Sequence, residues 1–205
     1  HLPKEKAVLT GSPIRQELLH GNKIAALDFC HLTADKPVIL IIGGSLGSVA
    51  VNNAVRAVLP ELLKDFHVVH LCGKGKIDDS LKNLPGYVQF EYIKEELKDL
   101  FALADIVISR AGANAICELL ALHKPTLLIP LSANASRGDQ ILNARSFERQ
   151  GFSLVLEEEN LTNTSLLDTI HKLYNNRESY INAMKKSSQQ DSIDTIIHLI
   201  EQAAK

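Results

Sequence analysis

The chain has 205 residues, of which 45% are hydrophobic and 22% charged, a balance typical of a globular protein with one large domain or two small ones. The formal net charge of −2 gives no bulk electrostatic basis for binding nucleic acid or anionic lipid. Three scattered cysteines, Cys30, Cys72 and Cys117, favour reduced core thiols of a cytoplasmic protein over a redox or metal role.

The N-terminal sequence carries no targeting signal and no initiator methionine. No run approaches the roughly 18 consecutive apolar residues of a membrane-spanning helix. No basic segment followed by an apolar one opens the chain, so the sequence offers no secretory signal. The first residues, HLPKEKAVLTG, lack an initiator methionine and lead at once into an expected strand. We therefore expect a piece of a longer protein, with residues missing upstream.

Apolar and β-branched runs alternate with helical patterns along the whole chain. The apolar runs are continuous, as in strands of a parallel sheet that is covered on both faces. Repeated strand–helix alternation predicts an α/β fold, a Rossmann-like doubly wound parallel sheet. The expected strands cover residues 7–9, 37–43, 67–73, 87–93, 105–110, 126–130 and 152–157. The expected helices cover residues 48–63, 95–103, 113–123, 138–150, 164–175, 177–186 and 191–204.

The remaining segments complete the predicted organisation. Residues 20–36 are irregular and predict a loop with a short helix, while residues 157–163 are acidic and most simply form a solvated surface. Apolar residues at helical spacing in 191–204 predict that the helices from about residue 164 to 204 pack on the same core. Because no linker or repeat is evident, residues 1–205 are predicted to form a single domain.

The first motif is a glycine-rich turn, GGSLGS, at residues 43–48, between an expected strand and an expected helix. Glycine lets backbone N–H groups approach an anion, and a helix N-terminus adds partial positive charge, so phosphate is the natural ligand. The turn matches neither the dinucleotide fingerprint GxGxxG nor a Walker A loop. A tight turn with a serine cap is the alternative interpretation.

The second motif follows the strand that ends at Ser109. Arg110 and Gly112 turn the chain, a helix begins at Ala113, and Glu118 lies on its first or second turn. A carboxylate there can accept two hydrogen bonds from a ribose diol; alternatively, it is only a favourable charge near the helix N-terminus. Both turns lie at carboxyl ends of expected parallel strands, where ligands bind in open α/β sheets.

Weaker signals come from two other segments. Gln140 and Asn143 are three residues apart, hence on one helix face, and uncharged amides suit sugar hydroxyls. An exposed helix start with capping residues is the alternative there. Arg15, in LTGSPIR, has the guanidinium geometry that pairs bidentately with phosphate, although a single arginine is weak evidence.

Other classes of site have little support. His67 and His70 are three apart on an expected strand, so they point to opposite faces and cannot jointly bind a metal. The chain has no DxD motif of a metal-dependent sugar transferase, no cysteine pair for zinc and no GxSxG of a hydrolase.

Taken in order, residues 9–15 (LTGSPIR), 43–48 (GGSLGS), 90–130 and 136–144 (SRGDQILNA) resemble the C-terminal half of the MurG family. These are peptidoglycan N-acetylglucosaminyltransferases with two domains and a GT-B fold. The resemblance spans nearly the whole chain and is greatest to the form of Gram-positive bacilli. It implies a UDP-GlcNAc donor-binding domain for inverting transfer of GlcNAc to lipid-linked muramyl-pentapeptide, which converts lipid I to lipid II in peptidoglycan synthesis. It implies no cofactor, no metal and no nucleic-acid partner.

The resemblance also implies a role for particular residues. Ala115 stands where a threonine is common, so a hydroxyl contact to phosphate would be lost, and Asp139 replaces the first of a common glutamine pair. The implied donor contacts are Arg15, Gly44 and Ser45 near the diphosphate; the backbone of Ile93 at the uracil; Gly112, Ala113, Asn114 and Ala115 at the helix start that cradles phosphate and sugar; Glu118 on the ribose; and Gln140 and Asn143 on the GlcNAc hydroxyls.

In this family the acceptor-lipid site, the membrane-contacting patch and the candidate general base belong to an N-terminal domain that has no counterpart here. We therefore expect no catalytic residue in this chain, no turnover by it alone, and a soluble piece of an enzyme that works at the cytoplasmic face of the bacterial membrane. Two alternatives stay open. One is half of another GT-B-like UDP-sugar enzyme, a lipid glycosyltransferase or a UDP-GlcNAc 2-epimerase; the other is a non-catalytic sugar-nucleotide-binding module.

Overall fold

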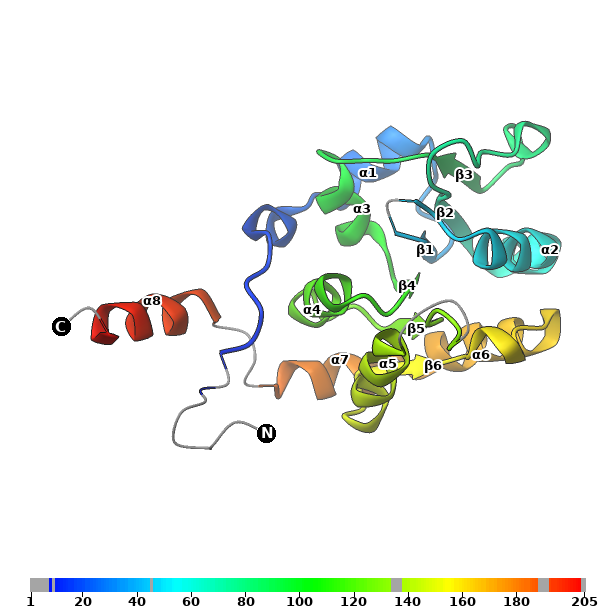
Figure 1. Ribbon diagram of the computed structural model, residues 1–205. Coiled ribbons are helices and arrows are strands. Elements are labelled where there is room, and N and C mark those ends of the chain that lie inside the picture. Colours follow the sequence, from blue (N-terminus) through cyan, green and yellow to red (C-terminus); the bar gives the residue numbers. More distant parts are fainter. Residues whose placement is uncertain (1–7, 9, 45, 134–137, 188–191, 204–205) are drawn as a thin grey trace.

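A six-stranded parallel sheet forms the centre of the molecule (Figure 1). The computed structural model describes residues 8, 10–44, 46–133, 138–187 and 192–203. The strand order β3-β2-β1-β4-β5-β6 is that of a doubly wound fold, which confirms the predicted fold class. The strands are β1 (Val38–Ile42), β2 (His67–Leu71), β3 (Tyr87–Phe90), β4 (Ile106–Ser109), β5 (Thr126–Leu128) and β6 (Ser153–Val155).

The central strand β1 reads VILII and is buried on both faces, as its continuous apolar run predicts. It pairs with β2 on one side, where Ile39 lies opposite Val68, and with β4 on the other, where Ile39 lies opposite Ile106. The last pair toward β4 joins Ile42 to Ser109, so β1 and β4 end level with each other. Their carboxyl ends therefore open on the same edge of the sheet.

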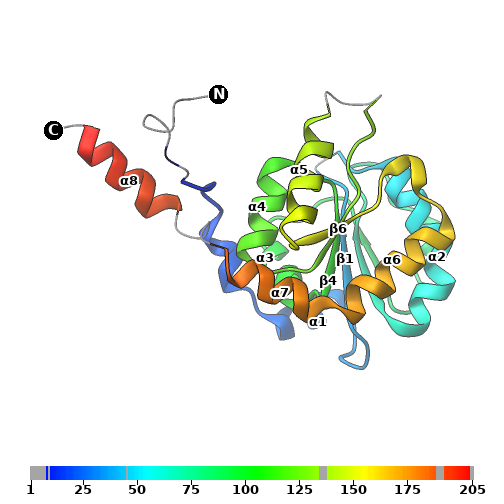
Figure 2. The ribbon, with the colours of Figure 1, turned by 90° about the horizontal axis from the view of Figure 1, so that it is seen from below.

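Helices cover both faces of the sheet (Figure 2). On one face α2 and α6 pack together over Ile39 and Ile41; on the other, α1 and α3 pack over Leu40. The two largest apolar clusters among the described residues therefore lie on opposite sides of the sheet. The helices are α1 (Lys23–Cys30), α2 (Val49–Asp65), α3 (Leu97–Leu103), α4 (Ala113–Ala121), α5 (Asp139–Arg149), α6 (Asn163–Asn175), α7 (Arg177–Lys185) and α8 (Ser192–Ala203), with short 3-10 turns η2 (Gln16–His20), η3 (Asp79–Leu81) and η4 (Glu158–Asn160).

Two predictions near the N-terminus have different outcomes. The short helix expected within residues 20–36 is α1, which Asn22 caps by accepting the N–H of Ile24 at 2.9 Å. The strand expected at residues 7–9 is not found at Val8, which has no regular structure and is 60% exposed. Residues 7 and 9 lie outside the described part of the chain.

The last helix, α8, differs from the prediction that the C-terminal helices pack on the core. In α6, Leu166, Ile170 and Leu173 are fully buried. In α8, Ile197 and Ile200 remain 49% and 63% exposed, and the helix stands apart from the layered body (Figures 1 and 2). The apolar spacing of α8 predicted its helical form correctly, but that spacing does not specify which surface the helix covers.

Candidate functional site

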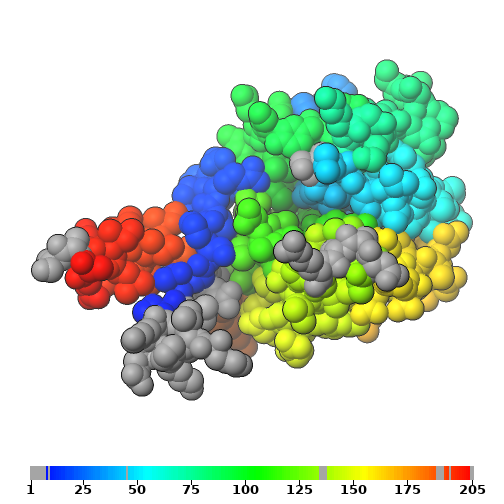
Figure 3. Space-filling view, in the orientation of Figure 1, coloured from blue at the N-terminus to red at the C-terminus, as the bar shows by residue number. Residues whose placement is uncertain are grey.

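A cleft of about 540 Å³ opens at the carboxyl ends of β1 and β4. The chain runs from β1 through α2 toward β2, and from β4 through α4 in the opposite direction toward β5. This reversal is the switch point at which open α/β sheets bind ligands. Figure 3 shows the surface of this face of the molecule. The cleft is lined by Ile42, Gly43, Gly44, Leu46, Gly47, Ser48, Val49, Ala50, Ser109, Arg110, Gly112, Ala115, Leu131, Gln140 and Glu158.

The glycine-rich turn forms one wall of the cleft. Gly47 has φ +66°, and a Cβ there would lie 1.9 Å from the carbonyl oxygen of Cys72 at the end of β2. Gly44 also has a positive φ, +86°, but a Cβ there would meet no described atom within 4 Å. Ser48 caps α2 by accepting the N–H of Val51 at 3.3 Å, so the alternative feature, a serine cap, is present as well. Ser45, a predicted contact, lies outside the described residues.

A buried polar network holds α2 against the end of β2, behind this turn. His70 is fully buried; its Nδ1 lies 2.9 Å from the Tyr87 hydroxyl and its Nε2 lies 3.0 Å from Oδ1 of Asn52. The amide of Asn52 donates to the carbonyl oxygen of Cys72 at 2.9 Å. Burial, together with the nearby charge of Arg56, lowers the pKa of His70 to about 3. The network therefore holds a neutral imidazole and fixes the first turns of α2.

The second turn starts α4. Gly112 is the N-cap residue, with no side-chain cap, and Ala113 and Asn114 are exposed. The first N–H groups of a helix have no intrahelical partner, so this helix start offers backbone donors to a ligand. Gly112 and Ala115 line the cleft. The start of α4 therefore leaves backbone N–H groups open beside the cleft, and these donors do not depend on a hydroxyl at residue 115.

Arg15 and Glu118 form a bidentate ion pair across 103 residues of sequence. Arg15 Nε donates to Oε1 of Glu118 at 2.8 Å, and Nη2 donates to Oε2 at 3.1 Å. The Glu118 side chain is only 14% exposed, whereas that of Arg15 is 47% exposed. The two residues expected on the ribose and the diphosphate therefore contact each other in this structure.

Arg15 borders a second hollow of about 510 Å³, beside α3. Tyr92 and Lys94 line the same hollow on either side of Ile93, whose own side chain is buried. At Ile93 the backbone rather than the side chain is therefore the part that could face this hollow; its role at the uracil stays a prediction. Tyr92, 58% exposed, is an aromatic surface that the sequence reasoning did not single out.

The two amides on α5 contact neighbouring loops. Gln140 lines the cleft, and its Oε1 accepts the N–H of Leu131 at 3.1 Å. Asn143 donates to the carbonyl oxygen of Ala111 at 3.1 Å and is not among the described residues that line the cleft. Both side chains therefore fix the backbone just after β4 and β5, which is a structural role.

The structure adds a charged pair that the sequence reasoning missed, Arg110 and Glu158. Arg110 is only 9% exposed, and its Nη2 lies 2.5 Å from Oε2 of Glu158. The prediction that residues 157–163 form a solvated surface is wrong for Glu158, because this side chain is only 24% exposed and lines the cleft. An arginine directly after a buried strand was the available signal, since a buried guanidinium requires an anionic partner.

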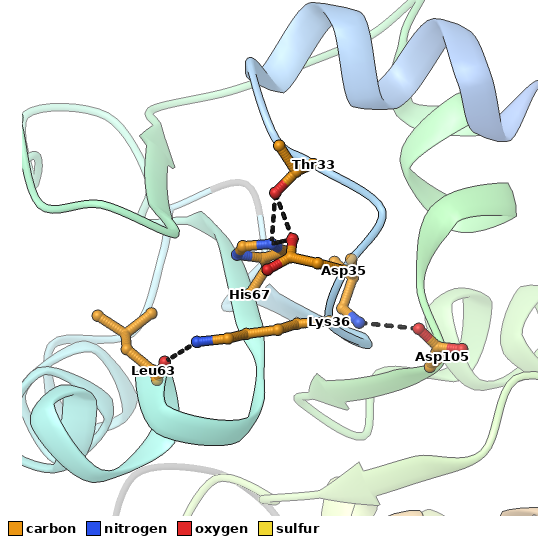
Figure 4. Close-up of polar contacts among 7 residues, drawn as sticks. Thr33, Asp35, Lys36, Leu63, His67 and Asp105 are labelled. Carbon is orange, nitrogen blue, oxygen red and sulfur yellow. Dashed lines mark hydrogen bonds and ion pairs between the residues drawn. The ribbon is translucent and has the colours of Figure 1, made fainter.

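A second polar cluster, drawn in Figure 4, lies at the amino end of β2, whereas the cleft lies at the carboxyl ends of β1 and β4. His67 Nε2 lies 2.9 Å from Oδ1 of Asp35, to which Thr33 also donates. His67 and His70 therefore have separate hydrogen-bond partners. Within the described part of the chain, no group of three His, Cys, Asp or Glu side chains is placed to hold a metal ion.

The fold and the family model agree: the chain belongs to the family described as the glycosyltransferase family 28 C-terminal domain, whose model matches residues 38–200. The relative from Lachnospira eligens is a UDP-N-acetylglucosamine--N-acetylmuramyl-(pentapeptide) pyrophosphoryl-undecaprenol N-acetylglucosamine transferase, 68% identical over 205 residues. That match covers 100% of this chain and 58% of the relative. A Bacillus thuringiensis transferase of the same name is 57% identical over 203 residues, covering 99% of this chain and 58% of the relative. These matches confirm the resemblance to the MurG family.

Solved structures agree on the fold. The crystal structure of Acinetobacter baumannii MurG has a TM-score of 0.68 and 24% identity, over 83% of this chain and 51% of that chain. A calicheamicin glycosyltransferase has a TM-score of 0.64 and 19% identity, over 83% of this chain and 45% of that one. The chain therefore spans about half the length of these proteins, from 45% to 58%.

Proposed function

We propose that this chain is the donor-binding part of an inverting glycosyltransferase that uses UDP-GlcNAc. The observation that supports this most directly is the arrangement around α4. The hollow beside Ile93 and Arg15 lies on the Glu118 side of this helix, and the cleft lies on the Gly112 and Ala115 side. A nucleoside diphosphate sugar has the same order of parts: base, ribose, diphosphate and hexose.

In this proposal each part of the donor meets a matching group. The uracil lies against the backbone of Ile93, and the ribose diol lies on Glu118. The diphosphate lies over the exposed start of α4, at Ala113 and Asn114, near the glycine-rich turn. The hexose then reaches the cleft beside Gln140, with Asn143 on the same helix face. Residues Ser45, Gly44 and Ala115 complete the contacts that the family resemblance implies.

The proposed reaction is transfer of GlcNAc to a hydroxyl of a lipid-linked muramyl-pentapeptide. The acceptor 4-hydroxyl attacks the anomeric carbon, the bond to the diphosphate breaks, and UDP leaves with inversion. Negative charge develops on the leaving diphosphate, where helix N-termini and Arg15 stabilise it without reorganisation. This chain would supply donor binding and leaving-group stabilisation.

The acceptor site and the general base are proposed to lie in a preceding domain. The relatives' names describe an acceptor that carries undecaprenol, a lipid, so the whole enzyme would work at the cytoplasmic face of the membrane. In the described part of the chain, no helix is long and apolar enough to cross a bilayer. We assign membrane contact to the preceding domain as part of this proposal. Residues 1–205 would form one donor-binding domain.

Calorimetric titration of this chain with UDP, UDP-GlcNAc, GDP and NAD tests the proposal. We expect the two uridine ligands to bind and the other two to bind weakly or not at all. Glu118→Ala should weaken UDP binding by about 1–3 kcal/mol, because two hydrogen bonds to a charged acceptor are lost. Equal affinity for all four ligands, or normal UDP binding by Glu118→Ala, would contradict the assignment.

A further inference from the structure

Glu158 is a carboxylate in the wall of the proposed sugar end of the cleft. It begins η4, directly after the segment that follows β6, and it lines the cleft together with Gln140. Its Oε2 atom is buried, so the 24% of the side chain that is exposed belongs to its other atoms. Within the described residues Oε2 accepts no well-formed hydrogen bond, although it lies beside Arg110 in the ion pair. The carboxylate therefore retains acceptor capacity at the cleft.

Arg110 holds this carboxylate in place. Its Nη1 donates to the carbonyl oxygens of Ile129 and Pro130, both at 3.0 Å, and its Nη2 donates to the hydroxyl of Ser48 at 2.6 Å. Nη2 also forms an ion pair with Oε2 of Glu158 at 2.5 Å. Each terminal nitrogen of a guanidinium carries two hydrogens, so the three hydrogen bonds use three of these four. Arg110 is thus a positioning residue, whose buried charge is already paired with Glu158.

The chemistry of Glu158 selects which part of a ligand it contacts. A carboxylate repels a diphosphate, whereas sugar hydroxyls donate hydrogen bonds to it. A buried, preorganised acceptor also discriminates strongly against ligands that lack the matching hydroxyl. Resting on the proposed function, we propose that Glu158 accepts a hydrogen bond from a hydroxyl of the donor hexose, and that Arg110 positions it for this contact. It would then determine affinity for the sugar and not for the nucleotide.

The experiment has to distinguish contact with the hexose from a second role of Glu158, which is to neutralise the charge of Arg110. A buried arginine needs a neutralising partner whatever the cleft binds, and Glu158 supplies one. If that were its whole role, replacing it would affect all ligands of the cleft alike. A third role would be electrostatic repulsion of the diphosphate by Glu158. Replacing Glu158 would then tighten the binding of both UDP and UDP-GlcNAc.

The test compares UDP with UDP-GlcNAc on the same variants by calorimetry. Glu158→Gln keeps the size and an uncharged acceptor, and Glu158→Asp keeps the charge but shortens its reach. Glu157→Gln is the matched control, because the neighbouring Glu157 pairs with Arg145 at 2.7 Å and does not line the cleft in the described residues. UDP binding by each variant also reports that it is folded.

We expect both variants to weaken UDP-GlcNAc about tenfold while UDP binding stays unchanged, because Glu158→Gln leaves only a weaker, uncharged acceptor and Glu158→Asp no longer reaches the hydroxyl. Glu157→Gln should leave both affinities unchanged. An equal loss for both ligands, or tighter binding of both, would overturn the inference while leaving the donor assignment standing. Failure of the unaltered chain to bind either ligand would instead remove the proposed function, and this inference with it.

Discussion

Gly47 and Gly44 have the same backbone requirement but different surroundings. Both adopt positive φ, yet only at Gly47 would a Cβ meet backbone, 1.9 Å from the carbonyl oxygen of Cys72. Gly47→Ala should therefore cost more than about 3 kcal/mol of unfolding free energy, because strain and a clash with immobile backbone add. Gly44→Ala should cost about 1–2 kcal/mol, from the left-handed backbone alone. Urea unfolding of the two variants measures the difference; similar losses would mean that the turn shifts to admit a methyl group.

The ion pair of Arg15 with Glu118 allows the contribution of the ribose to binding to be distinguished from that of the diphosphate. Removing Arg15 frees the Glu118 carboxylate and takes a cation away from the proposed diphosphate position. Arg15→Ala should weaken UDP about tenfold while leaving uridine binding unchanged or tighter. Arg149→Ala, an exposed arginine at the end of α5, serves as control. If Arg15→Ala weakened uridine and UDP equally, Arg15 would be only a support for Glu118.

At the scale of elements, the contact of α2 with β2 and β3 depends on a neutral His70. Its pKa is lowered to about 3 from an ordinary value of 6.5, so the folded protein binds this proton less readily than the unfolded chain. The stability contributed by His70 is therefore fully present above pH 6.5 and is lost as the pH falls toward 3. The expected slope is about 1.4 kcal/mol per pH unit.

His70→Gln tests this because it removes the titrating group. Unfolding free energy, measured between pH 6.5 and about 4, should fall with pH in the unaltered chain and stay flatter in the variant. Below that range Asp35 also contributes, because hydrogen bonds from Thr33 and His67 lower its pKa to about 2. His20→Gln, at an exposed position on η2, should keep the original slope. The same slope in His70→Gln would show that another group carries the pH dependence.

Helices α6 and α8 offer a matched pair of isoleucines. Ile170 in α6 is 0% exposed and Ile197 in α8 is 49% exposed. Ile170→Ala should lower the unfolding free energy by about 2–5 kcal/mol, through lost burial and the cavity left behind. Ile197→Ala should change it by less than about 0.5 kcal/mol. Denaturant titration distinguishes them, and a large loss for Ile197→Ala would show that α8 packs on the body in solution.

At the scale of the whole molecule, local pattern predicted the sheet well and the side-chain partners poorly. The runs at 37–43, 67–73 and 105–110 became β1, β2 and β4, because continuous apolar stretches between turns have few other ways to be buried. The glycine turns followed from the same local chemistry. Glu158 was missed because its partner Arg110 lies 48 positions earlier, and no local pattern encodes that distance. The placement of α8 was missed for the same reason.

The central position of β1 has a consequence for how the chain folds. β1 pairs first with β2, through the nearby α2, but its other edge pairs with β4, where Ile39 lies opposite Ile106. The cleft requires both edges, since its floor joins the ends of β1 and β4. Closing such a long loop is slow, because its entropy is lost before the new contacts form. During synthesis β1 therefore has an open hydrogen-bonding edge until β4 has emerged, and an open edge is where strands of different chains associate.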